Sequence, residues 1–293
     1  MFRVFRCLFA FIFALAVPCI AAPLRVATLS TVLTEIAQDV GGPDVVVTGI
    51  LAPGVDPHTF EPAPSDLIAL TQADIVLASG LGMESYLDRI AANSGTRARI
   101  LVAGRVLGRT VIVVDTHGHS DPDPHWWHSI AAMTLVTRWI ATEFTASKPE
   151  SAGGFQSRAA AYIGRLAALD TWARGQLAAL PLDRRELVTT HDAFGWFARD
   201  YGFTVHPISG LSTESEPDAR DFAALVDFIR RRHIPAIFPE SDENAKLAAA
   251  LARETGARLG EPLYADGLVP ADDGATYDAM FRHNVRAIVA GLR

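Results

Sequence analysis

Two Asp-Pro-His tripeptides stand out among the residues of this chain that could do chemistry, at Asp56–His58 and at Asp123–His125. The residue before a proline is pushed toward extended geometry, so each tripeptide is expected at the exit of a strand and not inside a helix. Loops of this kind carry binding residues on a rigid scaffold. A lone histidine is more often a surface or packed residue than a ligand, but the repeated context favours a metal site.

The elements that must position these histidines alternate between strands and helices. In the first part, strands are predicted at 24–29, 45–51, 74–79, 99–102 and 111–114, with helices at 31–40, 64–73 and 83–93. In the last part, strands are predicted at 187–190, 203–208, 235–238 and 258–259, with helices at 193–201, 218–233, 244–255 and 277–292. This alternation predicts parallel sheets, whose ligands lie beyond the carboxyl ends of the strands.

A long helical pattern separates the two alternating parts. After a predicted helix at 130–144, Ser147-Lys148-Pro149-Glu150 gives a strong helix start. Apolar residues then recur at intervals of three and four until Pro181, which predicts one helix of about 30 residues, well beyond the usual length. A coiled coil is the alternative to a rigid spine between two lobes. The apolar stripe consists of Phe155, Ala159, Tyr162, Leu166, Leu169, Ala173 and Leu177.

The predicted fold class is therefore α/β, with two lobes of parallel-sheet β/α units joined by one long backbone helix. The expected division is a signal peptide at 1–22, an amino-terminal lobe at 23–146, a linking helix at 147–181 and a carboxy-terminal lobe at 182–293.

The first residues have the layout of a secretory signal peptide. Arg3 and Arg6 precede an apolar run of about ten residues that ends in small residues, and the run is too short to span a membrane. A lipoprotein interpretation of Cys19 is weaker, because the residues before it lack the usual pattern. We therefore expect export to the periplasm with the signal peptide cleaved.

Both cysteines, Cys7 and Cys19, lie in this segment, so the mature chain is expected to lack thiolate ligands. A metal site must then be built from His, Asp and Glu. The net charge of −7 becomes more negative when the basic signal segment is removed. An acidic surface argues against nucleic acid as a partner.

Four candidate ligands stand at equivalent strand-end positions: His58 and His125 in the first lobe, and His191 and Asp266 in the second. Each is 66 to 75 residues from the next along the chain, so the site would be assembled in the cleft from distant loops. Three imidazoles and a carboxylate suit a tetrahedral Zn²⁺ ion.

Four motifs extend this interpretation to a family. The stretches Val55–Pro62, Asp123–Trp127, Thr190–Phe197 and Leu263–Leu268 resemble the motifs of the periplasmic solute-binding proteins of zinc and manganese ABC transporters. The resemblance covers essentially the whole mature chain and implies two α/β lobes with a metal between them. The ligands that it implies are the same four.

The chain also departs from the family's pattern. The long His- and Asp-rich loop of many zinc members is reduced here, so His117 and His119 are expected to capture metal transiently and not to coordinate it finally. Gly267 stands where the family commonly has serine, which puts a contact to Asp266 in doubt. Glu240, at a strand end, is a candidate accessory ligand, and a supporting role is favoured.

The expected function is high-affinity Zn²⁺ capture and delivery to an ABC membrane permease, without catalysis. A manganese-binding homologue and a metal-binding adhesin are the alternatives. A three-histidine zinc hydrolase is less favoured, because Asp266 would close the position that a reactive water needs. The expected chain is a monomer, and a periplasmic zinc chaperone is a candidate partner.

Overall fold

The computed structural model describes residues 22–93, 95–108, 110–114, 120–214, 219–240, 245–270 and 275–293. The first lobe is built on a parallel sheet with the strand order β2-β1-β3-β4. Its strands are β1 (Leu24–Thr28), β2 (Val45–Gly49), β3 (Ile75–Ala78) and β4 (Arg99–Val102). Its helices are α1 (Thr31–Gly41), α2 (Pro64–Gln72) and α3 (Leu87–Asn93), and its 3₁₀ turns are η1 (Gly42–Asp44) and η2 (Ala103–Val106).

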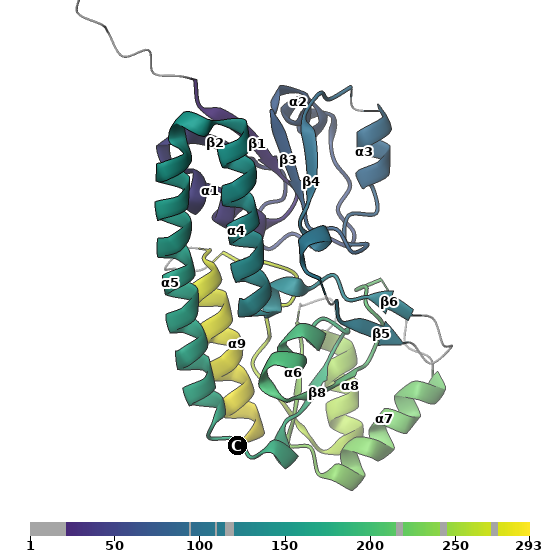
Figure 1. Cartoon of the computed structure of the whole chain (residues 1–293). Helices are drawn as coiled ribbons and strands as arrows, with labels where there is room; N and C mark the ends of the chain where they lie inside the picture. The colour runs from purple at the N-terminus through teal and green to yellow at the C-terminus, as the bar shows by residue number, and fades with distance from the viewer. Residues whose placement is uncertain are drawn as a thin grey trace, which may run out of the picture.

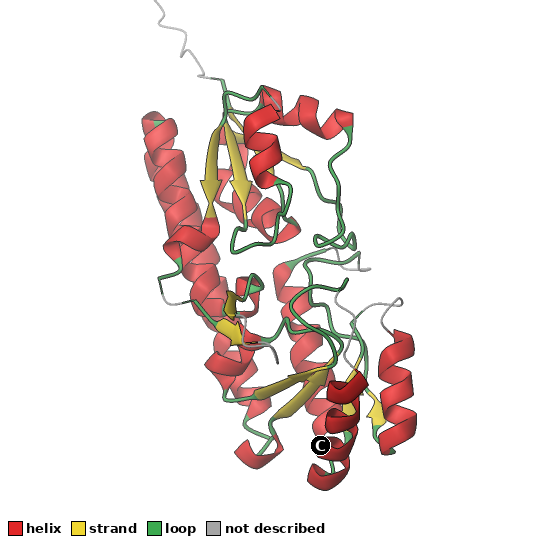
Figure 2. Cartoon of the chain, turned by 90° about the vertical axis from the view of Figure 1, so that its right-hand side faces the viewer, coloured by secondary structure: helices red, strands yellow, loops and turns green. Residues whose placement is uncertain are grey.

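The second lobe repeats this topology. Its parallel sheet has the order β10-β9-β7-β8, so in both lobes the first strand lies between the second and the third. The strands are β7 (Glu186–Thr189), β8 (Thr204–Pro207), β9 (Ala236–Phe238) and β10 (Arg258–Leu259). The helices are α6 (Gly195–Tyr201), α7 (Ala219–Arg232) and α8 (Ala245–Thr255), and η5 (Leu182–Arg184) precedes β7. Figure 2 shows the two sheets at opposite ends of the molecule.

Central strands of this kind need apolar residues on both faces. All four residues of β3 are buried, as are the three residues of β9. A strand that is covered by helices on both faces consists almost entirely of apolar residues, and for this reason these segments could be recognised in the sequence.

Three long helices form the spine. They are α4 (Ile130–Ser147), α5 (Ala152–Leu177) and α9 (Tyr277–Leu292), which lie side by side in Figure 1. Helix α5 has 26 residues and is about 39 Å long. All seven residues of the predicted apolar stripe are buried on it. The α/β fold class with parallel sheets is therefore confirmed.

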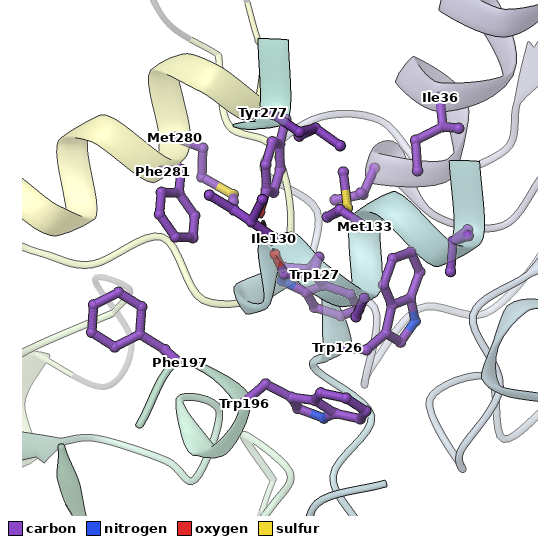
Figure 3. Close-up of a cluster of buried hydrophobic side chains, with 14 of the residues drawn as sticks. Ile36, Trp126, Trp127, Ile130, Met133, Trp196, Phe197, Tyr277, Met280 and Phe281 are labelled. Carbon is purple, nitrogen blue, oxygen red and sulfur yellow. Dashed lines mark hydrogen bonds between the residues drawn. The ribbon is translucent and has the colours of Figure 1, made fainter. Parts of the chain in front are cut away.

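The spine also gives the two lobes a common hydrophobic core. Figure 3 shows side chains from α1, α4, α6 and α9 meeting around Trp126 and Trp127, both of them fully buried. The cluster includes Ile36 from the first lobe, Phe197 from the second lobe and Phe281 from the spine helix α9. Because packed cores resist continuous deformation, the junction between the lobes is expected to be stiff.

Some element boundaries differ from the sequence-based expectations. The predicted helix 83–93 begins only at Leu87, because the Glu84 carboxylate accepts hydrogen bonds from Ser79 N (2.6 Å) and Gly80 N (2.8 Å) and holds the chain in a turn. The linking helix starts at Ala152, since Pro149–Ser151 forms a 3₁₀ turn, η4.

A further difference lies before the second Asp-Pro-His motif. No strand is predicted from the sequence between residues 115 and 186, but Ser120–Pro122 forms strand β6, antiparallel to β5 (Ile112–Val114). These three residues have low strand propensity, so their conformation depends on pairing with β5. The predicted signal segment lies almost wholly outside the described residues. Within the described part of the chain, no helix is long and apolar enough to cross a membrane.

Candidate metal centre

Four side chains from distant segments converge between the lobes. His58 lies in the loop after β2, His125 immediately precedes the 3₁₀ turn η3 (Trp126–His128), His191 follows β7, and Asp266 lies between β10 and α9. One ligand atom from each lies within 4.8 Å of every other, and this is the group among the described residues that could hold a metal ion. The structure thus brings together the four residues selected from the sequence.

Five of the six separations among the four ligand atoms are close to those of a regular tetrahedron, and the sixth is below 4.8 Å. His125 Nε2 lies 3.2 Å from His58 Nε2 and 3.4 Å from His191 Nε2. Asp266 Oδ1 lies 3.3, 3.5 and 3.2 Å from the Nε2 atoms of His58, His125 and His191. An ion with bonds of 2.0 to 2.1 Å at the centre of a regular tetrahedron separates its ligands by about 3.3 to 3.4 Å. The observed separations bracket that value.

The Asp266 carboxylate supports the same interpretation. Its Oδ1 atom is buried and has no hydrogen-bond partner among the described residues, although three imidazole nitrogens surround it. A buried acceptor without a partner is unfavourable unless something else satisfies it. An ion at the centre of the tetrahedron would satisfy this oxygen and would take a lone pair from each imidazole.

His125 is held by a carboxylate on the side away from the cluster. Its Nδ1 atom is 2.9 Å from Asp123 Oδ1, which also accepts a hydrogen bond from the His125 backbone N at 2.9 Å. Both side chains are fully buried. A carboxylate on Nδ1 fixes the ring orientation and leaves the Nε2 lone pair free for a metal, the usual arrangement behind a metal-binding histidine.

His191 is supported in the same way from its own lobe. Its Nδ1 atom contacts the carboxylate of Glu240, which follows β9, the strand next to β7 in the sheet. Glu240 Oε2 also accepts hydrogen bonds from Thr190 Oγ1 (2.6 Å) and from His191 N (3.2 Å). These contacts place Glu240 behind His191 and outside the four-atom cluster.

His58 is positioned by a local turn that also reaches across the cleft. Asp56 Oδ1 accepts a hydrogen bond from His58 N at 2.8 Å, and Asp56 Oδ2 accepts one from Thr213 Oγ1 at 2.7 Å. A hollow of about 410 Å³, lined by Asp56, Thr213 and Asp266 among others, opens beside the site. An ion could enter there without passing through the core.

The charges of the site are strongly coupled. Burial alone would lower the pKa of His191, but the carboxylates of Glu240 and Asp266 raise it well above its ordinary value. Burial likewise opposes the rise in the pKa of His125, which the hydrogen bond with Asp123 and the close contact with Asp266 produce. Burial would raise the pKa of Asp266, yet the charge of His191 and the imidazole contacts hold it well below its usual range.

Three other residues were singled out from the sequence: His117, His119 and Gly267. His117 and His119 lie outside the described residues. Gly267 has a φ of 140°, and a Cβ atom on it would lie 2.6 Å from Thr31 Oγ1, so serine at this position would be strained in this chain.

Sequence reasoning missed two supporting residues. Asp123 was recognised only as part of the second Asp-Pro-His motif, and its role in orienting His125 was not predicted. The second is Thr31, whose hydroxyl accepts a hydrogen bond from Leu268 N at 2.9 Å, and nothing in the sequence indicated this bond.

Comparison with known proteins places the chain in a family. Residues 26–291 match the family described as zinc-uptake complex component A periplasmic (ZnuA). The chain is 33% identical over 276 residues to the manganese-binding lipoprotein MntA of Bacillus subtilis, covering 92% of this chain and 90% of that one. It is 32% identical over 277 residues to the zinc-binding protein TroA of Treponema pallidum, with coverages of 92% and 89%.

Solved structures agree with this assignment. The periplasmic zinc-binding protein TroA from Treponema pallidum superimposes with a TM-score of 0.83 at 31% identity, covering 92% of this chain and 99% of that one. A manganese-bound mutant of a periplasmic metal-binding protein from Candidatus Liberibacter asiaticus gives a TM-score of 0.85 at 25% identity, with coverages of 92% and 100%. The chain therefore belongs to the family of periplasmic zinc-uptake complex component A, the metal-binding substrate-binding proteins of ABC transporters.

Proposed function

We propose that this protein captures Zn²⁺ in the periplasm and delivers it to the membrane permease of an ABC importer. The ion is the cargo, held in the cleft by His58, His125, His191 and Asp266. Asp123 and Glu240 orient two of the imidazoles and keep their Nε2 atoms available. After the ion is released to the permease, protons bind again to some of the imidazole nitrogens that held it.

The observation that carries the choice of zinc is the shape and composition of the donor set. Five of its six donor separations lie between 3.2 and 3.5 Å and fit a tetrahedral ion with bonds of 2.0 to 2.1 Å. Imidazole suits zinc, whereas manganese favours carboxylate, carbonyl and water oxygens. Three of the four donors here are imidazoles.

Manganese is the second candidate, because the similarity of the chain does not choose between metals. The relative MntA is named for manganese, TroA for zinc, and the iron-binding protein YfeA of Yersinia pestis is 29% identical. The choice of zinc therefore depends on the site itself.

The site also favours metal binding over zinc-dependent hydrolysis. A hydrolase would need a water molecule in the fourth ligand position, and the Asp266 carboxylate occupies that position.

Competition between metals tests the proposal. The metal-free mature protein would be titrated with Zn²⁺ and Mn²⁺ at equal free concentrations near pH 7, with bound metal measured directly. We expect zinc to occupy one site and to displace manganese. If manganese displaced zinc, the zinc assignment would be wrong and the manganese candidate would replace it.

A matched pair of histidine variants tests the residues. His191→Gln removes one ligand and should weaken zinc binding by more than about 100-fold, beyond the 10- to 100-fold typical of an outer-shell change. His206→Gln is the control, because His206 is also paired to a carboxylate, Glu186 (2.7 Å), but lies away from the site. Equal affinities in the two variants would refute the ligand assignment.

A further inference from the structure

The backbone that carries Asp266 is bound by residues of the first lobe, although it follows the second-lobe sheet. Leu268 N donates a hydrogen bond to Thr31 Oγ1 at 2.9 Å, and Leu268 O accepts one from Gly54 N at 2.9 Å. Thr31 is the first residue of α1, and both Thr31 and Leu268 are buried. Both backbone polar groups of Leu268 are thus satisfied by the first lobe.

The residue on the other side of Asp266 is held as well. Ala265 O lies 2.8 Å from Trp127 Nε1, which donates to it, and 2.8 Å from His128 Nε2. These donors belong to the turn that follows His125. Asp266 therefore lies between two fixed backbone points, one residue before it and two residues after it.

The intervening Gly267 shows how close this contact is. A Cβ atom at this position would lie 2.6 Å from Thr31 Oγ1, well inside van der Waals contact. Its φ of 140° is a conformation that residues with a side chain rarely adopt. The chain between Asp266 and Leu268 therefore passes directly over the Thr31 hydroxyl, and small movements of that hydroxyl would be passed on to Asp266.

We infer that Thr31 is a positioning residue for Asp266, which holds the carboxylate in the tetrahedron through the bond to Leu268 N and the contact with Gly267. This inference rests on the proposed metal-binding function. The two ligands that follow second-lobe strands are then held by different lobes. Asp266 is tethered to the first lobe, whereas His191 is held by Glu240 within the second lobe.

Three variants of α1 test the role of Thr31. Thr31→Val keeps the shape but leaves the buried Leu268 N without its acceptor, and Thr31→Ser restores the acceptor. Thr34→Val is the matched control, because Thr34 lies on the same helix and its hydroxyl bonds to Thr28 Oγ1 (2.6 Å) and Ser30 O (2.9 Å), away from Asp266. Zinc affinity, the melting temperature without metal, and the visible absorption of the Co²⁺-loaded protein would be measured for each.

Thr31→Val should bind zinc about 10- to 100-fold more weakly than the parent, the range typical of a lost outer-shell contact. Its Co²⁺ absorption should change, because a displaced carboxylate alters the tetrahedral ligand field. Thr31→Ser should restore both affinity and spectrum, and Thr34→Val should change neither.

Two results would overturn the inference. One is parental affinity and an unaltered Co²⁺ spectrum in Thr31→Val. The other is an equal loss of affinity in Thr34→Val, which would show a general loss of stability. Failure of the parent protein itself to bind Zn²⁺ or Co²⁺ would instead refute the proposed function, so the two failures are distinguishable.

Discussion

Zinc binding should release protons and weaken as the pH falls, because carboxylates raise the pKa values of two of the imidazoles. The pKa of His191 is raised well above its ordinary value by Glu240 and Asp266, against the effect of burial, and that of His125 is raised by Asp123 and Asp266. A raised pKa means that the metal-free site holds these protons at a higher pH than free imidazole would. Zinc requires the neutral ring, so binding must expel them.

The size of the effect follows from the number of protons. Each proton that leaves on binding changes the dissociation constant about tenfold per pH unit, or about 1.4 kcal/mol. Because His125 and His191 repel each other when both are charged, we expect between one and two protons, and hence a loss of about 10- to 100-fold between pH 7 and pH 6. The raised pKa values extend this dependence above pH 6.5, where free histidine would no longer contribute.

Calorimetry in buffers of different ionisation enthalpy counts these protons, and competition titrations between pH 6 and pH 8 give the slope. Glu240→Gln removes the charge that raises the pKa of His191, so it should release fewer protons at neutral pH. Glu186→Gln removes a similar carboxylate beside His206 and should leave the count unchanged. A zinc affinity that stayed constant from pH 6.5 to pH 8 would refute this reasoning.

Other predictions concern the residue that supports His125, the stability of the fold and the rate at which zinc is loaded. Asp123→Asn should weaken zinc binding by about 10- to 100-fold in a competition titration, with parental affinity as the contrary result. Burial raises the pKa of Glu84 to about 7, despite hydrogen bonds from Gly80 and Ser79, so the folded protein keeps a proton that the unfolded chain loses near 4.5. The free energy of unfolding should therefore fall by about 3 kcal/mol as the pH rises across that interval, and Glu84→Gln should flatten this slope in urea titrations; equal slopes would contradict it. Replacing His117 and His119 by alanine should slow zinc transfer from a donor chelator or protein more than it changes the affinity, whereas an unchanged rate with a large affinity loss would assign them to the site.

The sequence predicted the features that depend on local pattern. Buried strands such as β3 are continuous apolar runs, and the stripe on α5 repeats at helical spacing, so both could be read before the fold was known. The candidate ligands were found because each stands where a strand ends or beside a repeated Asp-Pro-His motif. Ligands bind beyond the carboxyl ends of parallel strands, and here His58 follows a strand of one sheet and His191 a strand of the other.

The features that depend on tertiary contacts could not be read in this way. Strand β6 forms from Ser120, Asp121 and Pro122 only because β5 lies beside it. The contact between Thr31 and the Asp266 segment joins residues 237 positions apart in the sequence. The placement of Glu240 behind His191, and not in the cluster, follows from the pairing of β7 with β9. Each of these depends on which elements become neighbours.

Diffraction from crystals grown with Zn²⁺, with anomalous data on both sides of the zinc edge, tests the central claim most directly. We predict one anomalous peak between the lobes, about 2.0 to 2.2 Å from the Nε2 atoms of His58, His125 and His191 and from Asp266 Oδ1. Glu240 should contact the His191 ring and not the ion. A peak coordinated by Glu240, or one bound away from these four atoms, would contradict the account.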